Sequence, residues 1–199
     1  MIAVDVVLLP DEAMTDSAIM LNRELVEKYG QKIVLDKQNC LPHISLAMGC
    51  VGQERIDEVG DALKKIAEES SLGNLCAVGI AVSTNTMGEK ISSLEIERTE
   101  DLQFLHEQVM EKLGPYLSNE VTADMVMGPE IAETTLAWIR DYRETSSFQN
   151  FFPHITIGYG KTEGRIFPAR FSASKLALCH LGNHCTCRKV LVSVDLKAE

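Results

Sequence analysis

The 199-residue chain is 45% hydrophobic and 24% charged, a balance typical of a globular protein that buries one core, as a single domain or as two small lobes. Its formal net charge of -10 argues against a general nucleic-acid coat protein and against a binder of anionic membranes, since both need clustered cations. A small phosphate-bearing ligand stays compatible, because a few local donors can hold it. We therefore expect a small partner, no membrane partner and a monomer.

The chain opens with Met-Ile-Ala-Val-Asp-Val-Val-Leu-Leu-Pro, a segment that is apolar but short and that lacks a basic leader. The segment predicts an opening strand rather than a signal peptide or a membrane span. The six cysteines occur without a secretory context, so we expect reduced thiols and a cytoplasmic location.

Hydrophobic periodicity predicts helices and strands along the whole chain. Helices are expected from a cap at Thr15 or Asp16 to Gly30, over 56–67, and from a cap at Thr99 to 114–115. Strands are expected at 2–9, 33–35, 43–48, 75–83, 90–97, 134–140, 154–159, 171–181 and 184–196, and a surface loop at 160–170. Residues 116–133 fit a short helix or a loop equally well. The mixture indicates an α+β fold, with helices layered on mostly antiparallel sheet.

An internal match is the most informative feature of the sequence. Residues 39–49 read Asn-Cys-Leu-Pro-His-Ile-Ser-Leu-Ala-Met-Gly, and residues 150–160 read Asn-Phe-Phe-Pro-His-Ile-Thr-Ile-Gly-Tyr-Gly. Such self-similarity indicates two copies of one supersecondary unit, related by a pseudo-two-fold axis. Outside this segment the two halves match poorly, so the duplication hypothesis rests on the match and on a rough agreement in element order.

If both segments are strands, alternate side chains share a face. His43 and Ser45 then point to one side, and His154 and Thr156 do the same in the second copy. The apolar residues between them can pack under helices, which leaves the polar pairs in a cleft between lobes. A single such triplet is a weak signal, because a strand histidine is often only a hydrogen-bonded structural residue. Two copies with shared flanks favour a functional role.

The same alternation predicts which face of the strand the residues after each pair occupy. Ala47 and Gly158 continue the polar face, and their small size leaves room for a ligand. Met48 and Tyr159 fall on the packed face. The proline before each histidine favours extended geometry at the residue that precedes it, consistent with a strand that begins there.

Two histidines facing one cleft suit the cleavage of a phosphodiester bond. This reaction needs a base that activates the attacking oxygen and an acid that protonates the leaving oxygen, and an ordinary histidine pKa near 6.5 allows one neutral and one charged imidazole near pH 7. The hydroxyls of Ser45 and Thr156 can donate to the non-bridging oxygens, where negative charge builds up. Neither a metal nor another cofactor is required, and no carboxylate cluster near the segments suggests one.

The segments His43-Ile44-Ser45-Leu46 and His154-Ile155-Thr156-Ile157 resemble the paired motifs of the 2H phosphoesterase superfamily, which includes the 2′-5′ RNA ligase-like proteins and the cyclic phosphodiesterases. The C-terminal hairpin is also similar to the way these chains close. The resemblance implies a bilobal, duplicated α+β domain over 1–199, with two mostly antiparallel sheets around a central cleft and helices on the outer faces. One lobe would carry His43 and the other His154. Ser45 replaces the commoner threonine and keeps the hydroxyl.

A run of cysteines and histidines at 179–187 invites a second interpretation. A two-residue turn at 182–183 would pair His180 with Cys185 and put Cys187 on the same face. These three side chains could bind zinc, although their spacing matches no familiar ligand pattern. The alternative is that the cysteines are small buried hydrophobic residues, which we prefer.

Other candidate residues flank the second motif. The cations that could reach a phosphate or a base edge are Arg140, Arg143, Lys161 and Arg165, each of which fits a solvated surface position better. Trp138 and Tyr142 could stack on a base, but core packing is the default for an aromatic residue on a strand. His106, on the third helix, is expected to be structural or exposed.

The sequence thus predicts a metal-independent phosphodiesterase acting on a 2′,3′-cyclic phosphate, or a related phosphodiester, of a nucleotide or short RNA terminus. Two alternatives stay open. The same constellation could run the reverse reaction and join RNA ends with a 2′-5′ linkage. It could also belong to a non-catalytic nucleotide- or RNA-binding module, although such a module needs donors and not a matched acid/base pair.

Overall fold

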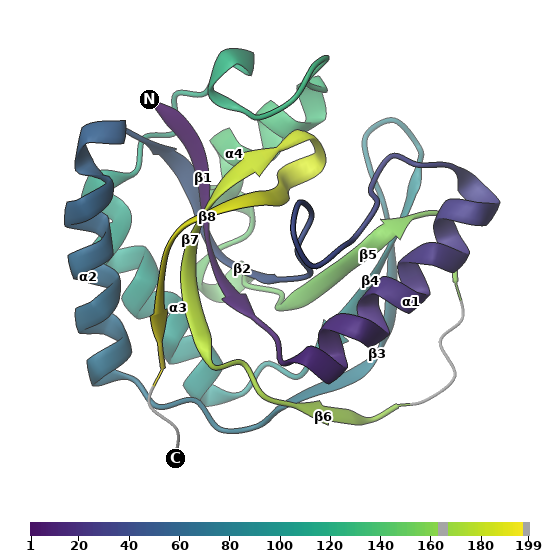
Figure 1. The fold of residues 1–199 in the computed structure, drawn as a ribbon, viewed down its shortest axis with the longest axis horizontal. Coiled ribbons are helices and arrows are strands. Elements are labelled where there is room, and N and C mark those ends of the chain that lie inside the picture. Colours follow the sequence, from purple (N-terminus) through teal and green to yellow (C-terminus); the bar gives the residue numbers. More distant parts are fainter. Residues whose placement is uncertain (163–166, 197–199) are drawn as a thin grey trace.

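The computed structural model describes residues 1–162 and 167–196, and it confirms the α+β class (Figure 1). The α-helices are α1 (Glu12–Tyr29), α2 (Ile56–Glu69), α3 (Glu100–Leu113) and α4 (Glu133–Thr145). The strands are β1 (Ile2–Leu9), β2 (Ile44–Val51), β3 (Leu75–Thr84), β4 (Lys90–Ile96), β5 (His154–Tyr159), β6 (Ala169–Phe171), β7 (Lys175–Gly182) and β8 (Thr186–Asp195). Short 3-10 turns η4 (Phe148–Asn150) and η5 (Asn183–Cys185) border the centre of the fold. No α-helix in the described part of the chain is both long and apolar enough to span a bilayer.

The strands form one sheet in the order β6-β3-β4-β5-β2-β1-β7-β8, and every neighbouring pair is antiparallel. The expectation of two sheets is therefore not confirmed. The junction at the middle is nevertheless narrow, because β2 and β5 are joined by a single residue pair, Ile44 with Ile155. We call β1, β2, β7 and β8 the first half of the sheet and β3 to β6 the second half.

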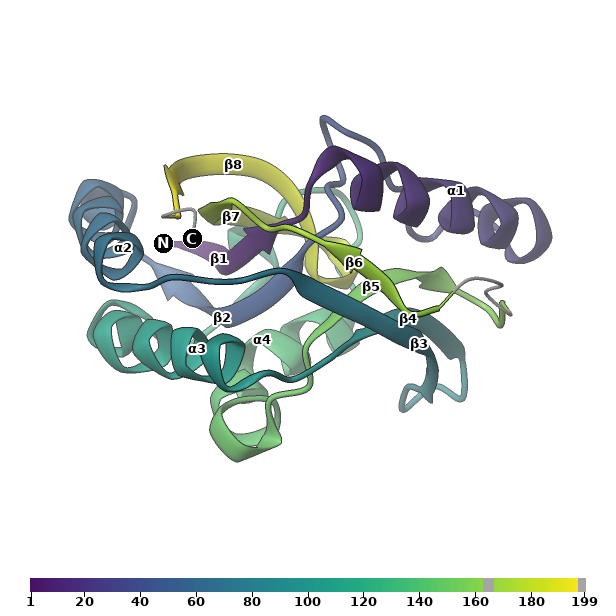
Figure 2. The same ribbon diagram turned by 90° about the horizontal axis from the view of Figure 1, so that it is seen from below.

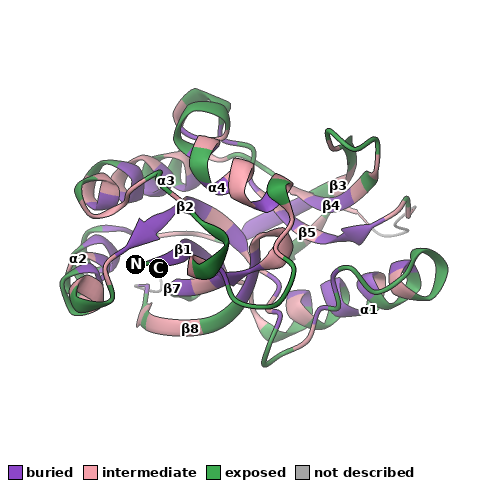
Figure 3. Ribbon diagram, turned by 90° about the horizontal axis from the view of Figure 1, so that it is seen from above, coloured by how far each residue is buried: buried purple, intermediate pink, exposed green. Residues whose placement is uncertain are grey.

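The helices cover the two halves in a crossed manner. Helix α1 follows β1 directly in sequence, yet it packs on β5 in the second half. Helix α3 follows β4 and packs on β2 and α2 in the first half, while α2 packs on β7 and β8. Figure 2 shows α1 at one end of the molecule and α2 with α3 at the other. Buried residues gather on the central strands and on the inner sides of the helices (Figure 3).

The sequence prediction is wrong for two strands. Residues 134–140 lie in α4, whose buried side chains Thr135, Ile139 and Tyr142 recur at helical spacing. Their β-branched and aromatic character favoured a strand, but the packing of one helix face outweighs that preference. Residues 33–35 form no strand. The side chain of Asn22 binds the Ile33 carbonyl and the Leu35 N–H, in place of a neighbouring strand. Apart from Glu133, which begins α4, residues 116–133 consist of 3-10 turns and irregular chain, with isolated bridges at Ser118 and Met127.

Helix boundaries are closer to expectation. Thr99 caps α3, since its hydroxyl accepts a hydrogen bond from Leu102 N. Gly30 ends α1 with a φ of 99°, as its position after the last helical turn predicts. The cap of α1 is Asp11 and neither Thr15 nor Asp16, because the Asp11 carboxylate accepts from Met14 N.

The C-terminal hairpin differs from the predicted pairing. Gly182 pairs with Thr186, and the three residues of η5 form the loop, so His180 faces Lys189 instead of Cys185. Cys187 forms a disulfide with Cys179 across β7 and β8, which contradicts the expectation of reduced thiols at this pair. Cys40, Cys50, Cys76 and Cys185 are free thiols.

Asn22 of α1 is fully buried and connects three backbone groups. Its amide nitrogen donates to the carbonyls of Ile33, at 3.0 Å, and Ile157, at 2.8 Å. Its carbonyl oxygen accepts from Leu35 N at 2.8 Å. The amide thus joins β5 to the irregular segment that leads into the first motif, and it replaces the strand pairing predicted there.

His106 of α3 makes the corresponding connection in the other half. Its Nδ1 lies 2.9 Å from the carbonyl oxygen of Leu46, and its Nε2 accepts from Phe148 N at 2.8 Å. The ring stacks on Phe151 with the two planes 1° apart. His106 is fully buried, which confirms its structural interpretation. It joins β2 to the segment that leads into the second motif.

We predict that Asn22→Ala lowers the free energy of unfolding by about 3 kcal/mol, because each buried polar group left without a partner costs about 1–3 kcal/mol. Urea denaturation followed by circular dichroism measures the change. Ser17→Ala, on the exposed side of the same helix, is the control and should change the value by less than about 0.5 kcal/mol. An equal effect of the two substitutions would contradict the bridging role of Asn22.

Candidate active site

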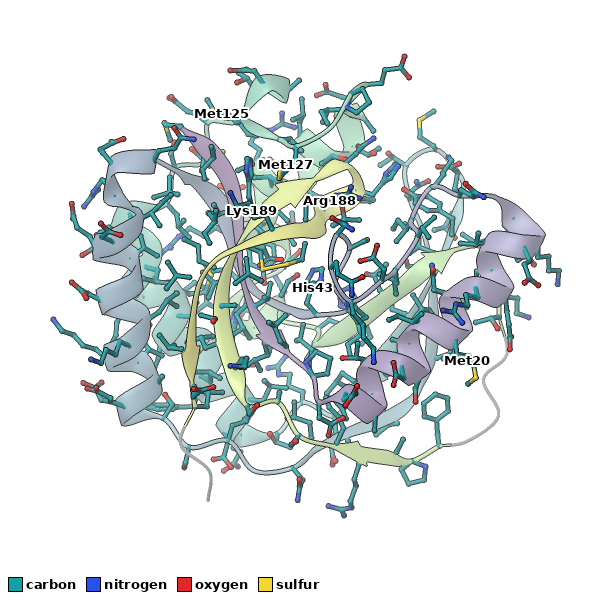
Figure 4. All side chains as sticks on the ribbon, in the orientation of Figure 1. Met20, His43, Met125, Met127, Arg188 and Lys189 are labelled. Atoms are coloured by element: carbon teal, nitrogen blue, oxygen red, sulfur yellow. A yellow bond between two sulfur atoms is a disulfide. The ribbon has the colours of Figure 1, made fainter. Side chains whose placement is uncertain are left out.

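A cavity of about 390 Å³ opens where the two halves of the sheet meet, and both motifs contribute to its wall. His43, Ser45, His154 and Thr156 all line it, so the structure brings together the residues that strand alternation placed in a cleft. Figure 4 labels His43 near the centre of the molecule, between β7 with β8 and β5. His43 directly precedes β2, whereas His154 begins β5.

The two imidazoles are held in the same way. His43 Nδ1 lies 2.7 Å from the carbonyl oxygen of Leu41, and His154 Nδ1 lies 2.8 Å from that of Phe152. A carbonyl only accepts, so each Nδ1 carries a hydrogen and donates it. In the neutral ring Nε2 is then the unprotonated nitrogen, which is the form that a general base needs.

A bulge interrupts each motif strand at the same place. Val6 pairs with Ala47 and Val7 with Ser45, which leaves Leu46 without a partner in β1. In the second half, consecutive residues of β4 pair with Gly158 and Thr156, which leaves Ile157 without a partner. The unpaired residue is in both cases the third after the histidine. The carbonyls of these two residues are the ones that His106 and Asn22 bind.

The bulges overturn part of the predicted alternation, because one extra residue reverses which face the following side chains take. Met48 and Tyr159 pack against the core, as expected, but they also line the cavity. Ala47 belongs to the buried core. Gly158 has a φ of 135° and lies against α1, where an added Cβ would come within 3.1 Å of the Asn22 amide nitrogen. The two small residues therefore serve packing and leave no room for a ligand.

The hydroxyls of the two motifs have different surroundings. Ser45 Oγ donates to Oδ2 of Asp5 at 2.6 Å. Among the described residues, Thr156 Oγ1 makes no hydrogen bond. Thr156 lines the cavity, so its hydroxyl is free to bind a ligand there. Asp5 also lies near His43, with 3.6 Å between Oδ2 and Nε2. Asp5 is fully buried in β1 and is a site residue that the sequence interpretation missed. A lone carboxylate in an otherwise apolar strand was the available signal.

Burial governs the charges of these groups. It lowers the pKa of His43 to about 4, although the Leu41 carbonyl partly opposes the shift by accepting from the ring. Burial also lowers the pKa of His154. The pKa of Asp5 moves the other way, well above its ordinary value, because burial disfavours the carboxylate, and the Ser45 hydrogen bond offsets only part of this effect.

Aromatic side chains shape the rest of the cavity. Trp138 and Tyr142 line it from α4. Tyr142 also belongs to the buried core, as expected, whereas Trp138 is only half-buried. Phe152 stacks on His154 with 5.6 Å between ring centroids and is 48% exposed. Tyr159 shares a hydrogen bond between its hydroxyl and Nδ1 of His184, at 3.1 Å.

Of the cations considered for a phosphate contact, Arg140, Arg143 and Lys161 do not line the cavity, in agreement with the preferred surface positions. Arg140 pairs with the carboxylate of Asp141 at 3.1 Å, and Arg143 stacks over the ring of Phe148. The hydroxyl of Tyr29 donates to the carbonyl of Lys161, which lines a separate groove beside α1. Arg165 lies outside the described residues.

The zinc hypothesis does not survive the observed register. Cys187 is bonded to Cys179, and His180 Nε2 lies 3.0 Å from the carbonyl oxygen of Met125. Among residues 1–162 and 167–196, histidine, cysteine and carboxylate side chains form no group of three or more that could hold a metal ion.

Comparison with known proteins places the fold. No family model and no curated protein matches the sequence. TT0787 of Thermus thermophilus is 16% identical, with a TM-score of 0.62 over 100% of both chains. Escherichia coli LigT in complex with 3′-AMP is 13% identical, with a TM-score of 0.47 over 98% of this chain and 97% of its own. A crystal structure described as a phosphoesterase is 12% identical, with a TM-score of 0.48 over 99% of both chains. The likeness to TT0787 establishes a shared fold over the whole chain.

We predict that both motif histidines carry their hydrogen on Nδ1 at pH 7 and titrate below pH 6.5, with His43 near pH 4, since burial lowers both pKa values. Nitrogen chemical shifts of the imidazoles, recorded by NMR from pH 3 to 8, measure tautomer and titration together. The assignments come from His43→Ala and His154→Ala. A hydrogen on Nε2 of either neutral ring would contradict the anchoring by the Leu41 and Phe152 carbonyls.

Proposed function

We propose that the chain is a phosphoesterase of the 2H type, which hydrolyses a 2′,3′-cyclic phosphate or a related phosphodiester of a nucleotide or RNA end by acid/base catalysis with His43 and His154. One observation carries the proposal. Two histidines face one cavity in matching frames, each with Nδ1 bound to a backbone carbonyl and with a hydroxyl two residues further on. The α+β fold expected from the family resemblance also agrees with the fold observed.

The reaction follows from what these groups can donate and accept. Nε2 of one neutral histidine takes a proton from water, whose oxygen attacks phosphorus. The bond from phosphorus to the ribose oxygen breaks, and the protonated Nε2 of the other histidine donates to that leaving oxygen. Thr156, whose hydroxyl has no partner among the described residues, donates to a non-bridging oxygen as charge develops on it, and Ser45 can do the same when its hydroxyl hydrogen turns from Asp5 to the substrate. Proton transfer and hydrogen bonding account for each step, so the mechanism uses no metal ion.

The size and lining of the cavity favour a compact substrate. A volume of about 390 Å³ is at the lower end of the range for small-ligand sites, roughly 300–1,000 Å³. Besides the motif residues, its wall includes the aromatic rings of Trp138, Tyr142 and Phe152, which offer flat surfaces to a base. These features support a nucleotide-sized phosphodiester as the group that enters.

The two alternatives fit the site less well. Joining RNA ends uses the same histidines but must hold two polyanionic strands against a net charge of -10. In both imidazoles Nδ1 is bound to a backbone carbonyl and Nε2 is left for a ligand. A non-catalytic binding module does not require such a matched pair. Hydrolysis therefore remains the leading proposal.

We predict that the protein hydrolyses 2′,3′-cyclic nucleotides in the presence of EDTA and that His43→Ala and His154→Ala each lower kcat by about 10²–10⁴-fold, the usual contribution of a general acid or base. Chromatography of the nucleotide products gives the rate and the isomer formed. Thr156→Val, which keeps the shape and removes the hydroxyl, should lower kcat by about 10²-fold.

The controls separate the alternatives. His180→Ala removes a half-buried histidine outside the cavity wall and should leave turnover within about 2-fold, because its ring contacts the Met125 carbonyl and not the cavity. Loss of activity on adding EDTA would overturn the metal-free mechanism. Binding of cyclic nucleotides without turnover on a range of phosphodiesters would favour the binding module. Joining of RNA fragments at a rate above hydrolysis would favour the ligase.

A further inference from the structure

The proposed reaction needs one proton held in the site at neutral pH, and the histidines by themselves do not hold it. The cleavage step requires a protonated acid beside a neutral base. Burial makes both motif imidazoles resist protonation. The matching frames around His43 and His154 give no reason for either ring to be the acid. An additional group must supply the proton and distinguish the two histidines.

Asp5 is placed to be that group. Its Oδ2 accepts from Ser45 Oγ at 2.6 Å and lies 3.6 Å from His43 Nε2, the ring nitrogen that is not bound to Leu41. Its Oδ1 is buried without a hydrogen-bond partner. A buried, ionised carboxylate with an empty oxygen is costly, whereas a carboxylic acid beside an imidazole is not. At 3.6 Å the two atoms are too far apart for a direct hydrogen bond, but they are close enough to titrate as a coupled pair, in which either Asp5 or His43 carries one proton and the pair has no net charge.

The second half of the site has no counterpart to Asp5. Asp5 pairs with Met48, the fifth residue after His43. At the corresponding position of the second motif, Tyr159 pairs with Ile91. Isoleucine cannot hold a proton. Glu95 of β4 pairs with His154 in register, but it is only half-buried, does not line the cavity and forms none of the ion pairs found among the described residues, so His154 lacks the buried partner that His43 has. The carboxylate is the feature that breaks the symmetry of the two frames.

The other groups that face Asp5 do not neutralise it. Tyr142 of α4 and Cys185 of η5 each feel its charge, and burial with that charge raises the pKa of both, so they stay protonated. Ser45 of β2 only donates a hydrogen bond. The ion pairs found among the described residues give Asp5 no lysine or arginine partner. His43 is thus the group with which Asp5 exchanges a proton.

We propose that Asp5 is a positioning residue that shares one proton with His43, and that this makes His43 the general acid and His154 the general base. The inference rests on the proposed phosphodiesterase function. His154 Nε2 takes a proton from water, the water oxygen bonds to phosphorus, and the bond from phosphorus to the ribose oxygen breaks. The shared proton passes from His43 Nε2 to that ribose oxygen. The pair is left with one proton fewer and His154 with one more, and exchange with solvent restores both.

The test is the pH dependence of kcat/KM for a 2′,3′-cyclic nucleotide, in the wild type and in Asp5→Asn, which keeps the shape but cannot hold the proton. The alkaline limb of the wild-type profile reports loss of the shared proton. In Asp5→Asn it should move toward acid by at least about one pH unit, and kcat/KM at pH 7.5 should fall about 100-fold, as for a missing general acid. The acid limb, which reports His154, should stay in place.

A leaving-group comparison separates this role from a structural one. In a p-nitrophenyl phosphodiester the leaving group is p-nitrophenolate, which departs without being protonated, so Asp5→Asn should lower the rate of its hydrolysis by less than about 5-fold. His154→Ala should lower the rates with this substrate and with the cyclic nucleotide about 100-fold each. Equal losses of Asp5→Asn on both substrates would overturn the proposal. Ser45→Ala is the matched control. It removes the hydrogen bond that stabilises the carboxylate, so its alkaline limb should move away from acid, opposite to Asp5→Asn.

Binding of dimethyl phosphate, a monoanion over this pH range, tests the shared proton without turnover. The wild type should bind it more weakly as pH rises, because loss of the shared proton leaves a negative charge beside the site. Asp5→Asn should bind it with the same affinity from pH 6 to 9. If the affinity for dimethyl phosphate depended on pH equally in the two proteins, the proposal would be overturned. If the affinities behaved as expected but the wild type did not turn over cyclic nucleotides, only the proposed function would be overturned.

Discussion

The carbonyls of Leu46 and Ile157, which the two bulges leave without a partner in the sheet, constrain much of this fold. A bulge leaves one residue of each motif strand unpaired, and a buried carbonyl must find another donor. Leu46 finds it in His106, and Ile157 finds it in Asn22. Each donor also accepts a backbone N–H from the segment that leads into the other motif. The position of each motif strand is thus tied to the segment that leads into the other motif.

The backbone around the two motif histidines is nearly symmetric, but the side chains beside them are not. The backbone repeats the same anchor for each imidazole and the same bulge after each hydroxyl. The difference lies in the neighbouring strands, where β1 presents a carboxylate and β4 an isoleucine at equivalent positions. Acid and base roles can diverge in this way without any change in the motifs themselves, because the distinguishing group comes from a strand beside them.

The sequence predicted the parts of the fold that local pattern controls. Helix α3 with its Thr99 cap, the hairpin of β3 and β4, and the convergence of His43 with His154 all follow from periodicity and repetition. Helix α4 was missed because β-branched residues concealed its helical spacing. The contribution of Met48 and Tyr159 to the cavity wall was missed because a bulge depends on a neighbouring strand that no local pattern reveals. Asp5 was missed because its partners lie about forty residues away in sequence.

The crossed helices also bear on how the chain can fold. Asn22 and the carbonyl that it binds are 135 residues apart, and β1 lies between β2 and β7, so the first sixty residues have no complete core of their own. Contacts of such long sequence separation slow folding and make it cooperative. During synthesis, the N-terminal segment must wait until nearly the whole chain has emerged. In the present form of the molecule, each half of the sheet is completed by elements from both ends of the chain.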